Sequence, residues 1–99
     1  MYQNQTRAID VITKDILIIN KLGLHARAAA KLVKLSSSFQ SSIDIEKDGQ
    51  RVNSKSIMGV MMLAASCGST VSITAEGDDQ QAAIDAITDL IDRRFDEEE

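Results

Sequence analysis

The stretch that decides the fold runs from Ser42 to Asn53 and reads S-I-D-I-E-K-D-G-Q-R-V-N. Apolar and polar residues alternate strictly over residues 42–46, which predicts a strand with one face in solvent. Asp48-Gly49 is a strong signal for a hairpin turn, and residues 50–53 follow as the returning strand. Because a tight hairpin joins two strands in antiparallel fashion, these twelve residues predict an antiparallel sheet.

The segments on either side of this hairpin add two strands and three helices. Residues 11–19 are rich in β-branched side chains and residues 70–75 alternate, so both predict strands. Good helix formers and apolar spacing predict helices over about 26–37, 57–63 and 80–94. The order β-α-β-β-α-β-α therefore predicts an α+β fold, in which helices pack on one face of an antiparallel sheet.

The length of 99 residues suits a single domain. Residues 1–10 show no periodicity and are expected to form a flexible leader. We expect the folded domain to cover residues 11–95. Residues 96–99 are all acidic, and we expect them to form a frayed tail.

The apolar runs and the single cysteine indicate in which compartment the protein resides and whether that compartment is reducing. The longest apolar run, residues 57–65, is too short to span a bilayer, and residues 1–10 lack the apolar core of a signal peptide. Cys67 cannot form an internal disulfide, and we interpret it as a buried or helix-end thiol in a reducing compartment. These features predict a cytoplasmic protein that is not bound to a membrane.

Charge is distributed unevenly along a chain whose formal net charge is −4. Residues 16–56 carry seven basic and three acidic side chains, whereas residues 76–99 carry two basic and ten acidic ones. The basic part suits an anionic ligand or an acidic partner, although a solvated surface with an acidic solubility tail explains the charges equally well. The acidic last third and the scarcity of aromatic residues argue against nucleic-acid binding. One His and one Cys do not make a metal site, so we expect neither a metal nor another cofactor.

His25, the only histidine, stands at the predicted start of the first helix. Backbone N–H groups at a helix N-terminus lack internal partners and favour anions, so a phosphorylated imidazole would be stabilised there. Arg27 opposes the helix dipole in the first turn, and its guanidinium could pair with phosphate oxygens in bidentate fashion. The alternative is a surface or helix-capping histidine, because Gly-x-His-x-Arg alone is a short pattern of low specificity.

Ser56 opens the second predicted helix, where a serine commonly serves as the N-cap. The alternative is a regulatory phosphorylation site, since a phosphate there would place negative charge beside an apolar surface. Ile57, Met58 and Met61 form that surface, either as core residues or as a docking patch.

Two segments resemble motifs of one known family. Asn20-Lys21-Leu22-Gly23-Leu24-His25-Ala26-Arg27-Ala28-Ala29 resembles the phosphorylation motif of the HPr-like phosphocarriers of the phosphoenolpyruvate-dependent phosphotransferase system. Lys55-Ser56-Ile57-Met58-Gly59-Val60 resembles the motif around the regulatory serine of that family. The resemblance covers about residues 12–94, and two motifs at matching separation are more specific than either alone.

The resemblance implies an open-faced β-sandwich of four antiparallel strands and three helices. It implies that Nδ1 of His25 accepts phosphate from enzyme I, itself phosphorylated by phosphoenolpyruvate, and passes it to a histidine of a IIA protein or domain. Arg27 would hold the phosphoryl oxygens. Ser56 matches the serine that an HPr kinase modifies in some bacteria. The partner-binding positions would be Lys34, Ile57, Met58 and Met61. Such a protein is a monomeric carrier without independent turnover, not an enzyme.

Three features depart from the pattern of the family. Ala28 stands where the family usually has proline, so we expect a slightly freer first helical turn. About ten residues are added before the first strand. The acidic tail extends past the usual end, which puts in doubt any role of the terminal carboxylate near the site.

Other functions stay open at this level. The carrier could serve sugar uptake or a nitrogen-type regulatory chain. A regulatory binding module controlled through Ser56 would need no phosphate on His25. An α+β interaction domain without phosphate chemistry would need neither His25 nor Arg27.

Overall fold

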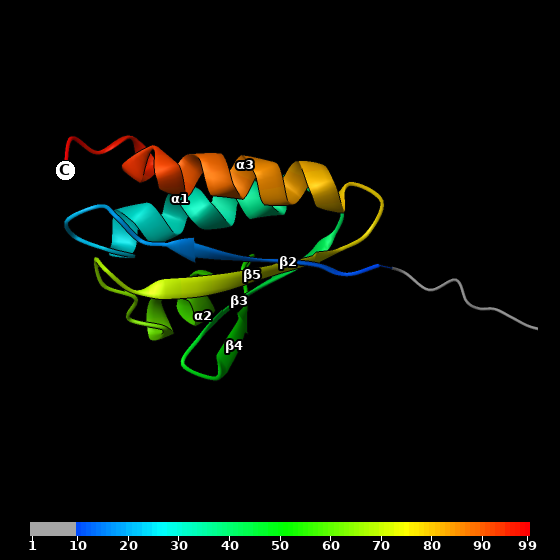
Figure 1. Ribbon diagram of the computed structural model, residues 1–99, viewed down its shortest axis with the longest axis horizontal. Coiled ribbons are helices and arrows are strands. Elements are labelled where there is room, and N and C mark those ends of the chain that lie inside the picture. Colours follow the sequence, from blue (N-terminus) through cyan, green and yellow to red (C-terminus); the bar gives the residue numbers. More distant parts are fainter. Residues whose placement is uncertain (1–9) are drawn as a thin grey trace, which may run out of the picture.

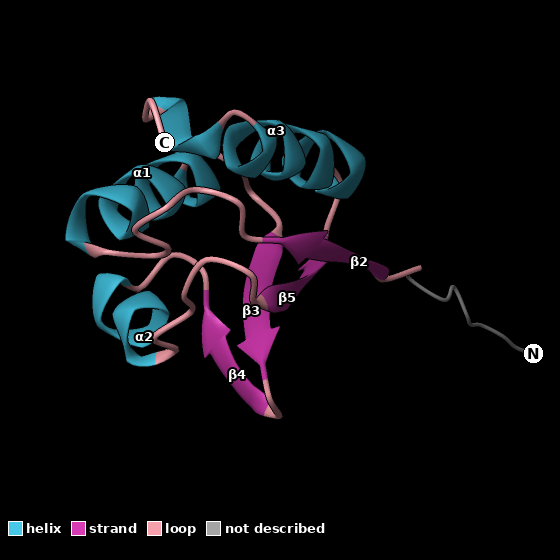
Figure 2. Ribbon diagram, turned by 60° about the vertical axis from the view of Figure 1, so that its left-hand side comes forward, coloured by secondary structure: helices cyan, strands magenta, loops and turns pink. Residues whose placement is uncertain are grey.

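The computed structural model describes residues 10–99 as a four-stranded antiparallel sheet covered by helices. Its strands are β2 (Ile12–Leu17), β3 (Ser42–Lys47), β4 (Gln50–Asn53) and β5 (Thr70–Glu76), arranged in the order β2-β5-β3-β4. The helices are α1 (Ala26–Ser37), α2 (Ile57–Met62) and α3 (Gln80–Asp92), followed by a 3-10 turn, η1 (Arg94–Asp96). The helices gather on one face of the sheet (Figures 1 and 2). The predicted α+β fold with four antiparallel strands and three helices is therefore confirmed.

The predicted hairpin is the outer part of this sheet. β3 and β4 pair antiparallel with Lys47 opposite Gln50, and Asp48 and Gly49 form the turn with φ of 52° and 83°. These positive values suit the two central residues of a two-residue hairpin loop. On its other side β3 pairs with β5, with Ile45 opposite Ile73.

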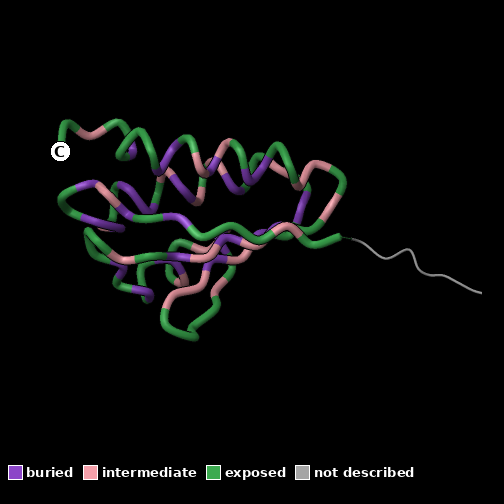
Figure 3. The backbone as a smooth tube through the Cα atoms, in the orientation of Figure 1, coloured by how far each residue is buried: buried purple, intermediate pink, exposed green. Residues whose placement is uncertain are grey.

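The core lies between the sheet and helices α1 and α3. Alternate residues of β5 are buried, namely Val71, Ile73 and Ala75, while the residues between them face away from the helices. Figure 3 shows the buried residues concentrated where the helices face the strands. The fully buried side chains contributed by the helices include Leu32, Ile84, Ile87 and Ile91, so the packing is largely aliphatic. Phe95 of η1 is the fully buried aromatic residue among residues 10–99.

Several element boundaries differ from the predicted ones by one or two residues. β2 begins one residue late, at Ile12, while β3 and β5 each extend one residue further, to Lys47 and Glu76. β2 ends at Leu17 because the backbone of Ile18 pairs with the loop before β5, donating to Ser69 O and accepting from Gly68 N. α2 ends at Met62, one residue before its predicted end at Leu63. α3 ends at Asp92 because Arg94 and the two residues after it adopt positive φ, which a right-handed helix cannot contain.

The tail also differs from its predicted state. Residues 96–99 do not fray into solvent: Glu97 is largely buried, and Glu99 O accepts from the backbone N–H of Lys21 at 2.5 Å. The leader predicted over residues 1–10 lies outside the described residues, apart from Asp10. No helix within residues 10–99 is long and apolar enough to cross a membrane.

Candidate functional site

His25 is the N-cap residue of α1. Its backbone is extended, with φ −72° and ψ 177°, and its carbonyl oxygen accepts the first helical hydrogen bond from Ala29 N at 2.8 Å. Its side chain makes no capping bond, so the ring is left to other contacts. The first-turn amides of α1 have no preceding turn to donate to, and no acidic side chain lies in that turn. The predicted position of His25 at the start of the first helix is thus confirmed.

A tight turn before α1 fixes where the histidine stands. The turn is closed by Gly23 N donating to Asn20 O at 3.1 Å, and Asn20 Nδ2 donates back to Gly23 O at 2.8 Å. Gly23 has φ +65°, and a Cβ at this position would lie 2.5 Å from Ala65 O. Leu24 N also donates to Ala65 O at 2.8 Å, so the turn is held against the loop before β5. Only glycine permits both this φ and this close approach.

Arg27 is exposed and lines the same open groove of about 800 Å³ as His25. Among residues 10–99, no carboxylate forms an ion pair with its guanidinium. A cation at this end of a helix is locally unfavourable, and the first turn of α1 contains no acid to offset it; the acidic residues 96–99 line the same groove without pairing with Arg27. The guanidinium is therefore available for an anion bound at the start of α1.

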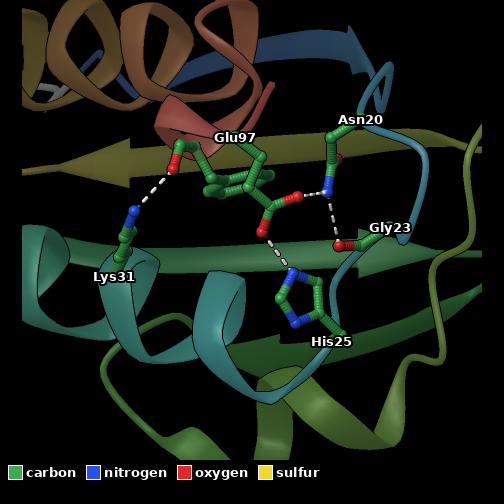
Figure 4. A network of polar contacts seen from close by, with 6 residues as sticks. Asn20, Gly23, His25, Lys31 and Glu97 are labelled. Carbon is green, nitrogen blue, oxygen red and sulfur yellow. Dashed lines mark hydrogen bonds and ion pairs between the residues drawn. The ribbon is translucent and has the colours of Figure 1, made fainter. Parts of the chain in front are cut away.

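Glu97 is the site residue that sequence reasoning missed. Its carboxylate contacts Nε2 of His25 through Oε2 and accepts a hydrogen bond from Asn20 Nδ2 at 2.9 Å through Oε1 (Figure 4). Burial acts to raise the pKa of Glu97, but the hydrogen bonds from Asn20 and His25 prevail and hold that pKa below its usual value. The only hint in the sequence was Phe95, an aromatic residue just before the acidic run, which anchors the tail in the core.

Ser56 is the N-cap of α2, as the first of its two interpretations predicted. Its Oγ accepts from Gly59 N at 3.2 Å, and its backbone is extended. The side chain is partly exposed. The structure thus explains Ser56 as a cap without testing its modification.

The residues proposed for partner binding are on the surface. Ile57, Met58 and Met61 of α2 are exposed, Met58 to 72%, and so is Met62, which the sequence analysis did not include. Lys34 is exposed on α1, the helix that packs beside α2. The core interpretation of these apolar residues is therefore wrong, and the docking patch stays a prediction.

Two further expectations concern thiols and metals. Cys67 is exposed in the loop before β5, with Sγ 3.8 Å from Ile19 O, so its interpretation as a buried or helix-end thiol is wrong. The described part of the chain holds no group of three His, Cys, Asp or Glu residues placed to bind a metal.

Comparisons with known proteins agree with this site. Residues 12–93 match the family described as the PTS HPr component phosphorylation site. The phosphocarrier protein HPr of Cupriavidus necator is 53% identical over 89 residues, which cover 90% of this chain and 100% of that protein. The phosphocarrier protein NPr of Shewanella violacea is 42% identical over 87% of this chain and 94% of its own length.

A solved structure shows the same fold. The crystal structure of HPr-C-His from Thermoanaerobacter tengcongensis superposes with a TM-score of 0.86 at 51% identity, covering 89% of this chain and 99% of that chain. Family match, curated relatives and superposition all include the turn and helix that carry His25 and Arg27. The chain belongs to the HPr family, the phosphocarriers of the phosphotransferase system.

Proposed function

We propose that His25 accepts a phosphoryl group on Nδ1 from enzyme I, which phosphoenolpyruvate has charged, and passes it to a histidine of a IIA protein or domain. The observation that carries this proposal is the pairing of His25 with an unpaired Arg27 at the N-terminus of α1. No hydrogen bond to Nδ1 occurs within residues 10–99, and in Figure 4 this nitrogen faces away from Glu97. A phosphoryl group on Nδ1 would lie near the first-turn amides and the guanidinium, both of which stabilise its charge.

The shallow groove suits a carrier rather than a self-contained enzyme. Phosphoryl transfer needs positioning and charge stabilisation more than covalent machinery, and a docked partner can supply what an open surface lacks. Of the cations that line the groove, Lys21 pairs with Glu99 and Lys31 donates to the carbonyl oxygen of Phe95, which leaves the guanidinium of Arg27 to hold the phosphate without enclosing it. The proposal includes a cytoplasmic monomer, with sugar uptake or nitrogen-type regulation as the two branches.

Labelling tests the carrier role directly. Incubation with enzyme I and radioactive phosphoenolpyruvate is expected to place one acid-labile, base-stable phosphate on His25. His25→Ala should abolish the label, while Arg51→Ala, a change on the distant strand β4, should not. An unlabelled wild type, or a fully labelled His25→Ala, would refute the proposal.

Docking is proposed to use the exposed residues of α2 together with Lys34. Ile57, Met58 and Met61 present an apolar surface, and methionine adapts to partners of different shape. Substitution Met58→Asp should weaken transfer from enzyme I without unfolding the protein, because Met58 is largely exposed. A Met58→Asp variant with the wild-type rate would remove Met58 from the proposed patch.

A regulatory role of Ser56 is a second proposal at the same surface. Phosphorylation by an HPr kinase would add about −1.5 to −2 charges beside Ile57 and Met58. Because Ser56 caps α2, a phosphate there would interact favourably with the helix N-terminus while making the neighbouring apolar surface unfavourable for docking. Incubation with an HPr kinase and ATP, followed by mass spectrometry of wild type and Ser56→Ala, tests this modification.

A further inference from the structure

After α3 the chain reverses direction through three residues with an unusual backbone conformation. Three consecutive residues that are not glycine adopt the left-handed conformation: Arg94 (φ 58°), Phe95 (φ 55°) and Asp96 (φ 62°). Side chains disfavour this region, and a run of three is rarer than single cases. The conformation must therefore be held by contacts made elsewhere.

Those contacts lie at both ends of the turn. The Phe95 ring is fully buried, and its carbonyl oxygen accepts from Lys31 Nζ at 2.6 Å. Arg93 Nε donates to Asp96 Oδ1 at 3.0 Å. Together they direct the next residue, Glu97, back over the start of α1 (Figure 4).

The carboxylate of Glu97 is held between the side-chain amide of Asn20 and the imidazole of His25. Asn20 is fully buried, and its Nδ2 donates both to Gly23 O at 2.8 Å and to Glu97 Oε1 at 2.9 Å. This bond to Gly23 prevents the Asn20 amide from presenting its oxygen to Glu97 instead. The other oxygen of Glu97 contacts Nε2 of His25, and the two side chains are only 18% and 28% exposed.

This geometry decides which nitrogen of His25 carries the proton. An ionised carboxylate only accepts hydrogen bonds, so Nε2 must be the donor. A neutral imidazole has one N–H, and Nδ1 is then left with the lone pair. That lone pair is what an attack on phosphorus requires.

We propose that Glu97 is a positioning residue, which fixes His25 in the Nε2–H tautomer and keeps that proton in place while Nδ1 carries a phosphoryl group. The inference rests on the proposed function. In the transfer, the Nδ1 lone pair forms the new bond to phosphorus, while the bond from phosphorus to the donor atom of enzyme I breaks and leaves its electron pair on the donor. No proton leaves Nε2, so the phosphorylated ring is an imidazolium whose positive charge faces Glu97. Onward transfer reverses these changes and returns a neutral ring, which is a good leaving group.

Two substitutions of Glu97 separate this proposal from a merely structural role. Glu97→Ala removes the acceptor, so both tautomers of His25 become accessible. Glu97→Gln has one side-chain oxygen, and Asn20 Nδ2 will occupy it because Asn20 is fixed by Gly23. The amide NH₂ then faces Nε2 and donates to it, which moves the proton of the ring to Nδ1. Glu97→Gln, although it has nearly the shape of the wild-type side chain, is therefore expected to slow phosphoryl transfer more than Glu97→Ala.

The experiment uses the full chain with ¹⁵N-labelled histidine. At pH 8 the imidazole shifts should report the Nε2–H tautomer in wild type, a mixture in Glu97→Ala and mainly the Nδ1–H tautomer in Glu97→Gln. The rate of transfer from enzyme I should fall in the same order, at least about tenfold for Glu97→Gln, which is typical when the partner that orients a histidine is lost. Glu76→Gln is the matched control, because Glu76 is exposed at the end of β5, does not line the groove, and its side chain makes no hydrogen bond or ion pair within residues 10–99.

The outcomes distinguish this inference from the function on which it rests. Wild-type tautomer signals in Glu97→Gln, or a wild-type transfer rate in that variant, would overturn the role of Glu97. Failure of wild type and Glu76→Gln to accept any phosphate would instead overturn the carrier function, whatever the tautomer signals show.

Discussion

The Nζ of Lys31 lies 2.6 Å from the carbonyl oxygen of Phe95, so the first helix holds the C-terminal turn in place. Lys31 is only partly exposed, and its partner belongs to a residue with positive φ. Together with the contact between His25 and Glu97, this hydrogen bond links α1, whose N-cap is His25, to the C-terminal segment.

Lys31→Met should loosen the tail without unfolding the domain. The substitution keeps most of the aliphatic stem but removes the hydrogen bond, which costs about 0.5–1.5 kcal/mol. We expect faster amide hydrogen exchange in residues 94–99 and little change in β5. Lys34→Met, on the exposed face of the same helix, is the control. Equal exchange in the two variants would show that Lys31 does not hold the tail.

Gly23→Ala should destabilise the whole protein by about 2 kcal/mol or more, since the residue has positive φ and its Cβ would clash with the Ala65 backbone. Gly49→Ala is a matched control, because Gly49 also has positive φ (+83°) but a Cβ there meets nothing within 4 Å. That control should lose only about 1 kcal/mol, the cost of the left-handed conformation. Urea unfolding of both variants measures the difference, and equal losses would show that the contact with Ala65 yields easily.

The local parts of this fold could be predicted from sequence, because their signals are local. Asp48-Gly49 indicated the hairpin, and His25 stood out as the single histidine at a helix start. The strand order β2-β5-β3-β4 depends on pairings between distant segments, such as Ile12 with Ala75, and no local pattern encodes them.

Glu97 could not be found in the same way. Its position depends on a left-handed run over Arg94, Phe95 and Asp96, and none of these is the glycine that would have signalled such a turn. The helix pattern continued through Arg94, so the tail was expected to leave the domain. Tertiary contacts of Phe95 and Lys31 override that local preference.

Arg27→Ala should have opposite effects on stability and on phosphoryl transfer. Removing a cation from the first turn of α1 relieves its conflict with the helix dipole and should stabilise the unphosphorylated protein by about 0.3–1 kcal/mol. Loss of the charged hydrogen bonds to the phosphoryl group should lower the transfer rate by about tenfold or more. Thermal unfolding and enzyme I kinetics measure the two effects, and a transfer rate equal to wild type would exclude Arg27 from the site.

Two substitutions of Ser56 should separate the effect of helix capping on stability from the effect of charge on docking. Ser56→Ala loses the cap of α2 and should cost about 1 kcal/mol of stability, while leaving transfer from enzyme I near the wild-type rate. Ser56→Asp keeps an oxygen that can cap the helix but adds negative charge beside the exposed Ile57 and Met58, so it should retain stability and slow the transfer. If both variants transferred phosphate equally fast, charge at Ser56 would not control docking.

Acid should destabilise the protein through carboxylates that are hydrogen-bonded only in the folded state. The side chain of Ser41 and the backbone N–H of Gln40 donate to Asp79 and lower the pKa of its carboxyl below the usual value. A pKa that is lower in the folded than in the unfolded protein contributes stability above the unfolded pKa, and that stability is lost as pH falls through the folded one. The free energy of unfolding should therefore decline as pH drops below about 4, the ordinary value for aspartate.

Asp79→Asn tests this source of acid sensitivity, because the amide keeps the side-chain shape but cannot titrate. Its unfolding free energy should be lower than that of wild type at pH 7 and should decline less steeply below about pH 4. The neighbouring Asp78→Asn is the control: Asp78 is exposed, makes no hydrogen bond or ion pair within residues 10–99, and should leave the pH profile of wild type unchanged. If the pH profile of Asp79→Asn ran parallel to that of Asp78→Asn, the contacts of Asp79 with Gln40 and Ser41 would not account for the acid sensitivity. The next group to substitute would then be the carboxylate of Glu97, because its pKa is also lowered.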